Sequence, residues 1–169
     1  MIWLSADIHF WDSKIIRKAH RPFRSIEDMN DEIIDRFNGK VSGGDTLILL
    51  GDVGREFQAH LDFCSRLHCR DIQLIPGNHD PESHLSQLYN RILPHIYSFQ
   101  YEGVHVVLSH YPIMRWNRSS KGSVHFYGHI HDDELHNGRS MNIGVDRFNF
   151  YPIDLPTAIS KVIDLPVAI

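Results

Sequence analysis

The stretch Ile72-Gln-Leu-Ile-Pro-Gly-Asn-His-Asp80 decides the fold class, because it joins a short apolar run to a glycine and three polar side chains. A short, nearly continuous apolar run is typical of a strand buried on both faces. Asn78, His79 and Asp80 follow Gly77 at the carboxyl end of this strand. Open α/β sheets bind their ligands at that end of their strands. The stretch therefore predicts a buried strand that delivers polar side chains to a site.

Four more predicted strands end in the same way. Residues 2–6, 46–50, 104–108 and 124–127 are apolar runs followed by Asp7 and His9, by Gly51-Asp52, by His110, and by Gly128-His129-Ile-His131. Side chains two positions apart in an extended segment point the same way, so each Asp-x-His or His-x-His pair can face one point. The glycines give the backbone freedom to turn just before the polar group.

Two helices are predicted between the first three strands. Residues 25–37 repeat apolar side chains at helical spacing, with Ser25 as the cap and Asn38-Gly39 as the stop. Residues 56–67 form the second predicted helix, with Phe57, Leu61 and Cys64 facing inward. Strands that alternate with helices predict crossover units and a partly parallel sheet.

The second half of the chain predicts a second sheet. Residues 96–110 have the pattern of a hairpin around Glu102-Gly103, and the strands after Ser123, including 140–143, leave little room for helices. We expect this sheet to be more antiparallel than the first. The predicted fold is thus α/β: a four-layer α-β-β-α sandwich in a single domain, residues 1–169, with a dinuclear metal site at the carboxyl ends of the strands. A short similarity between 153–159 and 163–169 leaves the role of the tail, 156–169, open.

Seven strand-end side chains are the predicted metal ligands: Asp7, His9, Asp52, Asn78, His110, His129 and His131. Oxygen and nitrogen donors without sulfur suit manganese, iron, zinc, cobalt or nickel, and the share of oxygen favours manganese. Seven ligands are too many for one ion, so we expect two divalent ions that share a carboxylate. Two such ions can activate a water molecule and neutralise a phosphoryl group. Each motif alone is weak, since Asp-x-His and Gly-Asp also occur in ordinary turns; the ordered set is specific.

This ordered set resembles the calcineurin-like metallophosphoesterase superfamily, and in particular a small, capless branch common in bacteria and their phages. The resemblance extends from residue 1 to about 155. It implies that Asp7, His9, Asp52 and His131 bind one metal ion and that Asp52, Asn78, His110 and His129 bind the other, with Asp52 as the bridge. It also implies that His79 contacts the phosphate and assists the leaving group, and that Asp80 orients His79. The implied activity is hydrolysis of a phosphomonoester or phosphodiester by a metal-bridging hydroxide.

The chain departs from the superfamily pattern after Asp52. Many members have a second aspartate followed by arginine there, whereas this chain reads Asp52-Val-Gly-Arg55. Arg55 either clamps a substrate phosphate as a third catalytic residue or is a solvated arginine at a helix start. Arg21 and Trp116 are weaker candidates for the wall of the substrate site, and Phe10 and Trp11 belong either to that wall or to the core.

Two other functions are compatible with these motifs. One is a metal-binding scaffold for protein interaction without catalysis, which has no need of His79; the other is a nuclease. The 17 basic and 21 acidic residues give a net charge of −4, which disfavours long nucleic acids and favours a small phosphate ester or a nucleotide as the substrate. No stretch predicts a membrane helix or a leader, so we expect a cytoplasmic protein. Oligomeric state stays open.

Eight further histidines lack the strand-end glycine and are expected to have structural or surface roles: His20, His60, His68, His84, His95, His105, His125 and His136. Cys64 and Cys69 are expected to be free thiols, because two cysteines are too few for a disulfide scaffold.

Overall fold

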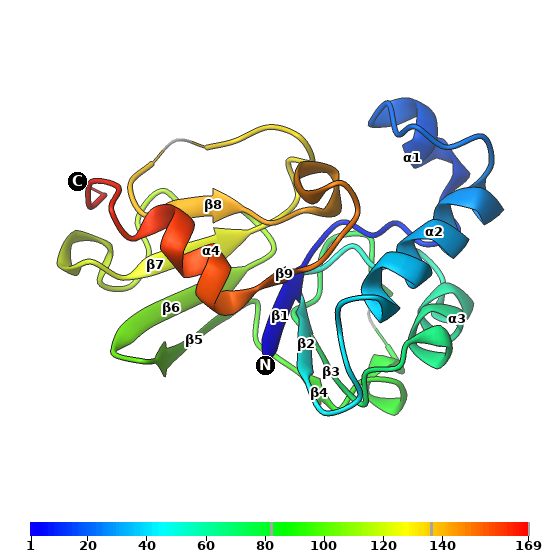
Figure 1. Ribbon diagram of the computed structural model, residues 1–169, viewed down its shortest axis with the longest axis horizontal. Coiled ribbons are helices and arrows are strands. Elements are labelled where there is room, and N and C mark those ends of the chain that lie inside the picture. Colours follow the sequence, from blue (N-terminus) through cyan, green and yellow to red (C-terminus); the bar gives the residue numbers. More distant parts are fainter. Residues whose placement is uncertain (82, 136, 169) are drawn as a thin grey trace.

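A computed structural model describes residues 1–81, 83–135 and 137–168, and it contains two β-sheets that face each other (Figure 1). His136 lies outside the described residues. The first sheet has the strand order β4-β3-β2-β1-β9. Its strands are β1 (Ile2–Ser5), β2 (Thr46–Leu49), β3 (Asp71–Leu74), β4 (Arg91–Ile92) and β9 (Ile153–Asp154).

The pairing of the first sheet aligns its strand ends. Strands β1 to β4 are parallel, and only β9 runs antiparallel to its neighbour β1. Ser5 is paired with Leu49, and Leu49 is paired with Leu74. The last residues of β1, β2 and β3 therefore lie side by side, and the polar residues that follow each strand leave the sheet at one edge.

The second sheet has the order β5-β6-β7-β8, formed by β5 (Ile96–Tyr101), β6 (Val104–Ser109), β7 (Val124–Tyr127) and β8 (Ser140–Asn142). The predicted hairpin is present, because β5 and β6 pair antiparallel around Glu102 and Gly103. The second sheet is more antiparallel than the first, as expected, since one of its three strand pairings is antiparallel against one of four; β6, β7 and β8 are nonetheless parallel. Segments 110–123 and 128–139, each roughly a dozen residues, are long enough to cross between parallel strands, and their described residues contain no α-helix, only a 3₁₀ turn at Ser119–Lys121.

The parallel arrangement brings the ends of both sheets together. His110 follows β6 and His129 follows β7, so both leave the second sheet at the same edge. A parallel bridge between Ala6 and Gly144 joins the chain after β1 to the chain after β8. The candidate ligands of both sheets therefore meet at this junction.

The described part of the chain forms four α-helices: α1 (Ser13–Lys18), α2 (Ile26–Asn38), α3 (Phe57–Arg66) and α4 (Leu155–Val162). Both predicted helices are confirmed; in α2 the Ser25 hydroxyl accepts a hydrogen bond from the amide of Asp28, as a capping residue does. The predicted inward face of α3 was wrong at Leu61, which is exposed, while Ala59, His60 and Phe63 are buried. Helix α1 and helix α4 were not predicted, because α1 is short and α4 falls in the tail of unassigned role.

Two apolar cores hold the layers together. One lies between the sheets and includes Leu4, Ile48 and Phe126. The other packs α2 and α3 against the outer face of the first sheet, as the right side of Figure 1 shows. Helix α4 inserts apolar side chains into the core between the sheets and contacts β9, β1 and β8. The α/β sandwich prediction is confirmed, and the tail residues 155–162 close one side of it.

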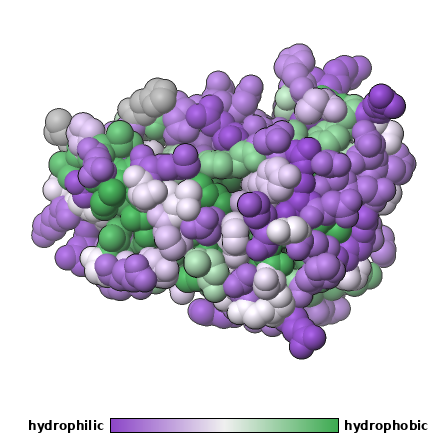
Figure 2. Space-filling view, in the orientation of Figure 1, coloured by the Kyte–Doolittle hydropathy of each residue, from purple (hydrophilic) through white to green (hydrophobic). Residues whose placement is uncertain are grey.

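The surface over α1, α2 and α3 is mainly hydrophilic on the face that Figure 2 shows, and hydrophobic residues gather near α4. Among the described residues, no helix combines the length and the apolar character that crossing a membrane requires.

The outer face of the second sheet is covered in part by the loop that contains Trp116. This residue is 5% exposed and packs against the ring of His125, with ring centroids 5.1 Å apart. Trp116 is thus part of the packing here and not of a substrate wall. The His125 Nδ1–H donates to the carbonyl of Val107, and Nε2 accepts from the amide of Ile113. Both bonds require a neutral ring, and burial lowers the pKa of His125 to about 4.

Because folding holds His125 neutral, we expect the protein to lose stability at acid pH. The pKa in the folded state lies below the ordinary value of 6.5, so the unfolded chain binds the proton more tightly. The free energy of unfolding should therefore fall as pH decreases from about 6.5 to about 4, by at most roughly 3 kcal/mol from this residue. Urea unfolding of metal-free His125→Gln across this window should give a flatter pH dependence. The exposed His68→Gln serves as the control, and equal slopes for both variants would contradict the assignment.

Candidate metal centre

The candidate ligands lie on tight turns after the strands. Asp7, His9, Asp52, His129 and His131 have φ values of 58°, 54°, 55°, 72° and 52°, all in the left-handed region. Residues with side chains adopt this region at a cost, and such conformations cluster at functional sites. Asp7 and His9 do converge, but through a turn and not through the expected extended backbone, whereas His129 and His131 offer their ligand atoms to two different groups of side chains.

Glycines precede the ligands because no side chain fits there. A Cβ atom on Gly77 would lie 2.3 Å from Oδ1 of Asp52. A Cβ atom on Gly128 would lie 2.6 Å from Oδ2 of Asp7, and one on Gly51 would lie 2.6 Å from Nδ1 of His110. The carboxylates of Asp52 and Asp7 and the imidazole of His110 thus occupy the space that a side chain at these glycines would need. The requirement at Gly77 and Gly128 is steric, whereas Gly51 also has a positive φ of 84°.

Two clusters of potential ligand atoms result. Asp7, His9 and His131 each offer one atom within 4.8 Å of the others, and Asp52, His110 and His129 form a second cluster by the same measure. Asn78 joins the second cluster, since its Oδ1 lies 3.1 Å from Nε2 of His110. The structure therefore brings all seven predicted ligands to one place.

The Asp52 carboxylate stands between the two clusters. Its Oδ2 lies 3.7 Å from Nε2 of His9 and 3.6 Å from Nε2 of His110. Its other oxygen accepts a hydrogen bond from the amide of His79, at 2.8 Å. One oxygen faces ligands of both clusters while the other is held by the backbone, which is the arrangement that a bridging carboxylate requires.

Burial of these carboxylates and imidazoles is energetically unfavourable unless a cation is bound. Burial raises the pKa of Asp7 to about 8, although the nearby His131 acts against this. Burial also lowers the pKa of His9 to about 2. Both ring nitrogens of His9 are buried and make no hydrogen bond among the described residues. A divalent cation would offset the carboxylates and take a lone pair of His9, so the donor set fits a metal site.

Surrounding groups fix the ring orientations of two histidines. Nδ1 of His110 lies 2.8 Å from the carbonyl of Leu50, and Nδ1 of His131 lies 3.0 Å from a carboxylate oxygen of Asp146. Such bonds leave Nε2 of each ring for a metal ion. Burial would lower the pKa of His131, but the Asp146 carboxylate outweighs it and raises the value.

Sequence reasoning missed Asp146 and misplaced Arg21. The Arg21 side chain is buried, and its guanidinium binds both oxygens of Asp146 at 2.8 and 2.9 Å. It also donates to the carbonyls of Asp7 and Ile8. Arg21 thus supports the first cluster from behind and does not line a substrate wall. The signal for Asp146 was present, because Gly144-Val-Asp146 follows the predicted strand 140–143 just as Gly-Asp follows the others.

Arg55 and His79 lie beside the clusters and face each other. Nη2 of Arg55 is 3.4 Å from Nε2 of His79, and the His79 ring lies 5.3 Å from that of His9. Arg55 is held by an ion pair of its Nε with Asp12, at 3.0 Å, and half of its side chain is exposed. Asp12, which no motif indicated, is also 3.8 Å from Nδ1 of His9. Arg55 is thus partly solvated just before α3 and is also held beside the clusters by Asp12.

Asp80 has a different place from the one expected. Its carboxylate accepts hydrogen bonds from the amides of Gly77, Asp52 and Val53, at 2.8 to 2.9 Å, and lies 3.3 Å from Nε2 of His60. Burial would raise the pKa of Asp80, but the bonds from His60 and from the Gly77 amide outweigh it and lower the value. Asp80 therefore ties the loop after β3 to the loop after β2, and it does not orient the His79 ring. Buried His60 has the structural role expected of it.

The chain matches the model of the calcineurin-like phosphoesterase superfamily domain over residues 2–144, and it belongs to that superfamily. It is 25% identical to an uncharacterized protein of Methanocaldococcus jannaschii, MJ1445, over 174 residues, which cover 95% of this chain and 90% of that one. Its fold is similar to that of the Aquifex aeolicus protein AQ665, with a TM-score of 0.77, 20% identity, and coverage of 96% of this chain and 99% of that chain. It is also similar to an archaeal phosphodiesterase, with a TM-score of 0.50, 19% identity and coverage of 85% and 82%. Superfamily membership supports a phosphoesterase function and hydrolase activity.

Because no Cβ atom fits at Gly77, we expect the added methyl group of an alanine there to weaken metal binding. Gly77→Ala should displace the Asp52 carboxylate, because the new Cβ would lie 2.3 Å from Oδ1 and 2.6 Å from the backbone nitrogen of Asp52. Elemental analysis of the purified variant should show less bound metal than wild type, with the far-UV circular dichroism spectrum retained. Gly44→Ala is the matched control, because a Cβ there meets nothing within 4 Å. Full metal content in Gly77→Ala would contradict the packing argument.

Removal of the Asp146 charge should also weaken metal binding, but less than the change at Gly77. Asp146→Asn removes the negative charge that holds both His131 and Arg21, so the affinity for one of two ions should fall by roughly 10- to 100-fold. Competition with a metal chelator measures this affinity. The exposed Asp164→Asn carries the same change in charge and should bind metal as wild type does. Equal affinities for the two variants would remove Asp146 from the centre.

Proposed function

We propose that the protein is a dinuclear metal-dependent phosphoesterase that hydrolyses a phosphomonoester or phosphodiester. The observation that carries this proposal is the Asp52 carboxylate, one oxygen of which faces both ligand clusters. The cytoplasm is the proposed location, and a small phosphate ester or nucleotide is the proposed substrate.

Two divalent ions would be held by the residues of the two clusters. Asp7, His9, Asp52 and His131 would bind one ion, and Asp52, Asn78, His110 and His129 the other. Manganese is favoured among manganese, iron, zinc, cobalt and nickel, because three of the seven side chains donate oxygen. When bound, such ions polarise a phosphoryl oxygen and lower the pKa of a coordinated water molecule.

Arg55 and His79 would act on the substrate and not on the metal. Asp12 binds Nε of Arg55, so Nη1, and Nη2 beside the His79 ring, would clamp phosphate oxygens. The His79 amide is held by Asp52, so its ring is fixed close to the ligands. We assign to His79 the donation of a proton or hydrogen bond to the leaving oxygen, while Asp80 positions the loop that carries it.

Substitution of two histidines separates catalysis from metal binding. His110→Ala removes a proposed ligand, so metal content and activity should fall together. His79→Gln should retain both ions and the fold, while turnover decreases by roughly 10²–10⁴-fold, as for a lost general acid. The decrease should be smaller for a nitrophenyl ester, because nitrophenolate leaves without a proton. Elemental analysis and rates on alkyl and nitrophenyl esters with added manganese measure both effects.

The exposed His68→Gln is the control and should match wild type in every measurement. An unchanged rate in His79→Gln on every hydrolysed ester would contradict the proposed mechanism. No hydrolysis by wild type across monoesters, diesters and cyclic nucleotides would instead favour a metal-binding scaffold.

A further inference from the structure

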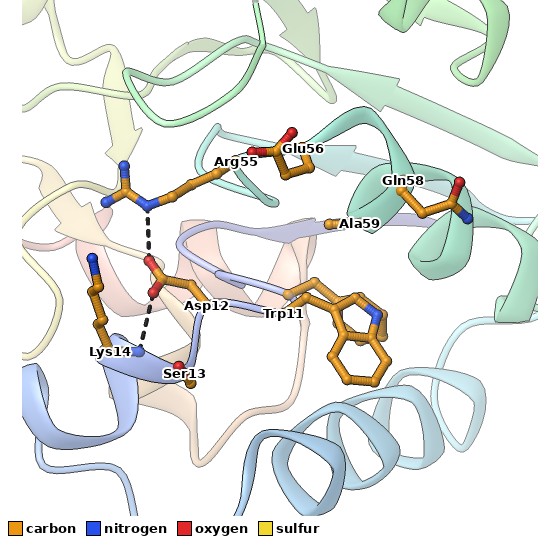
Figure 3. Close-up of a pocket in the computed structure, with 9 residues that line it drawn as sticks. Trp11, Asp12, Ser13, Lys14, Arg55, Glu56, Gln58 and Ala59 are labelled. Carbon is orange, nitrogen blue, oxygen red and sulfur yellow. Dashed lines mark hydrogen bonds and ion pairs between the residues drawn. The ribbon is translucent and has the colours of Figure 1, made fainter.

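A cavity of about 470 Å³ opens near the candidate metal centre, and Figure 3 shows the residues that line it. Asp12 and Arg55 line the cavity. The same two side chains contact the centre, since Asp12 lies 3.8 Å from Nδ1 of His9 and Arg55 lies 3.4 Å from Nε2 of His79. A group esterified to a phosphate at the centre can therefore extend into this cavity without crossing other elements.

The two ends of the cavity differ in chemistry. The charged ends of Arg55 and Lys14 lie on one side, next to the Asp12 carboxylate, and the Trp11 indole lies on the other (Figure 3). Phe10 and Ala59, both buried, complete the apolar part of the wall. This polarity matches a molecule with an anionic phosphate at one end and an apolar, flat group at the other. A volume of several hundred cubic ångströms is the usual size of a small-molecule site.

Trp11 is exposed and yet fixed in position. Its side chain is 44% exposed, while Nε1 donates a hydrogen bond of 2.7 Å to Asp62. The ring also packs edge-on against Phe10, with centroids 6.1 Å apart. Its backbone φ of 61° is in the left-handed region, which a bulky side chain rarely adopts. An exposed indole held in a strained position is preorganised to bind a flat ligand, because little side-chain freedom is lost on binding.

We propose that this cavity binds the organic group of the substrate, that this group is a nucleoside, and that its base stacks on Trp11. The inference rests on the proposed phosphoesterase function and deepens it by naming the substrate class. Trp11 acts as a specificity-determining residue, and Lys14 with Arg55 holds the phosphate end. Gln58 and Glu56, which also line the cavity, offer polar groups to the edge of a base.

The test compares substrates with and without a base. Wild-type protein with manganese should hydrolyse nucleoside monophosphates with a lower KM than ribose 5-phosphate or glycerol phosphate. Trp11→Ala should raise KM for the nucleotides by roughly 5- to 100-fold, the range that loss of one base–aromatic stack produces. It should leave KM for the two base-free esters and kcat for all esters nearly unchanged, and Trp11→Phe should restore most of the affinity. Tyr151→Ala, at another exposed aromatic residue, is the control.

A binding measurement tests the cavity independently of turnover. Nucleoside monophosphate should quench the tryptophan fluorescence of metal-loaded wild type, and this quenching should persist in Trp3→Phe and disappear in Trp11→Phe. A KM shift in Trp11→Ala that is equal for nucleotides and base-free esters, or no KM shift for the nucleotides, would overturn the nucleoside inference and leave the phosphoesterase function intact. If no ester is hydrolysed, the phosphoesterase function is overturned. If nucleotide also fails to quench Trp11 fluorescence, the nucleoside inference is overturned as well.

Discussion

Two buried carboxylates that lie close together impose the main constraint on this structure. Asp7 and Asp52 are 0% and 2% exposed; burial raises the pKa of Asp7, and the nearby Asp52 charge adds to this rise. Burial lowers the pKa of His9 and of His129, so these two rings offset little of this charge. Cations bound between Asp7 and Asp52 would neutralise these two acids. The glycines before the ligands and the Arg21–Asp146 ion pair hold the two acids in the positions that this requires.

The sequence predicted most of the layout because strand ends carry two signals at once. An apolar run followed by a polar residue, with a glycine between them in three of the five strands, marks both a buried strand and a candidate ligand position, and the structure brings the seven candidate ligands together. Elements without this double signal were missed. Asp12 follows no strand, and short helix α1 has few apolar residues. The parallel pairing of β6, β7 and β8 could not be read from composition, because loops of ordinary sequence replace the usual crossover helices.

Residues that support the centre were harder to assign than the residues that form it. Arg21 and Asp80 are both charged and near the predicted ligands, and both were assigned to the substrate or to catalysis. In the structure each binds backbone groups of the ligand loops. A charged side chain can hold a turn or contact a substrate with the same chemistry, and only its burial and its partners distinguish the two roles. Burial of Arg21 and of Asp80 is a tertiary property that the local sequence does not encode.

The Ala6–Gly144 bridge has a consequence for the molecule as a whole. Each ligand cluster takes residues from both sheets: Asp7 and His9 follow β1 while His131 follows β7, and Asp52 follows β2 while His110 and His129 follow β6 and β7. An ion bound by either cluster is thus a cross-link between the layers. Because only the docked sandwich presents a complete cluster, metal binding there would link metal affinity to docking of the sheets, so that each strengthens the other.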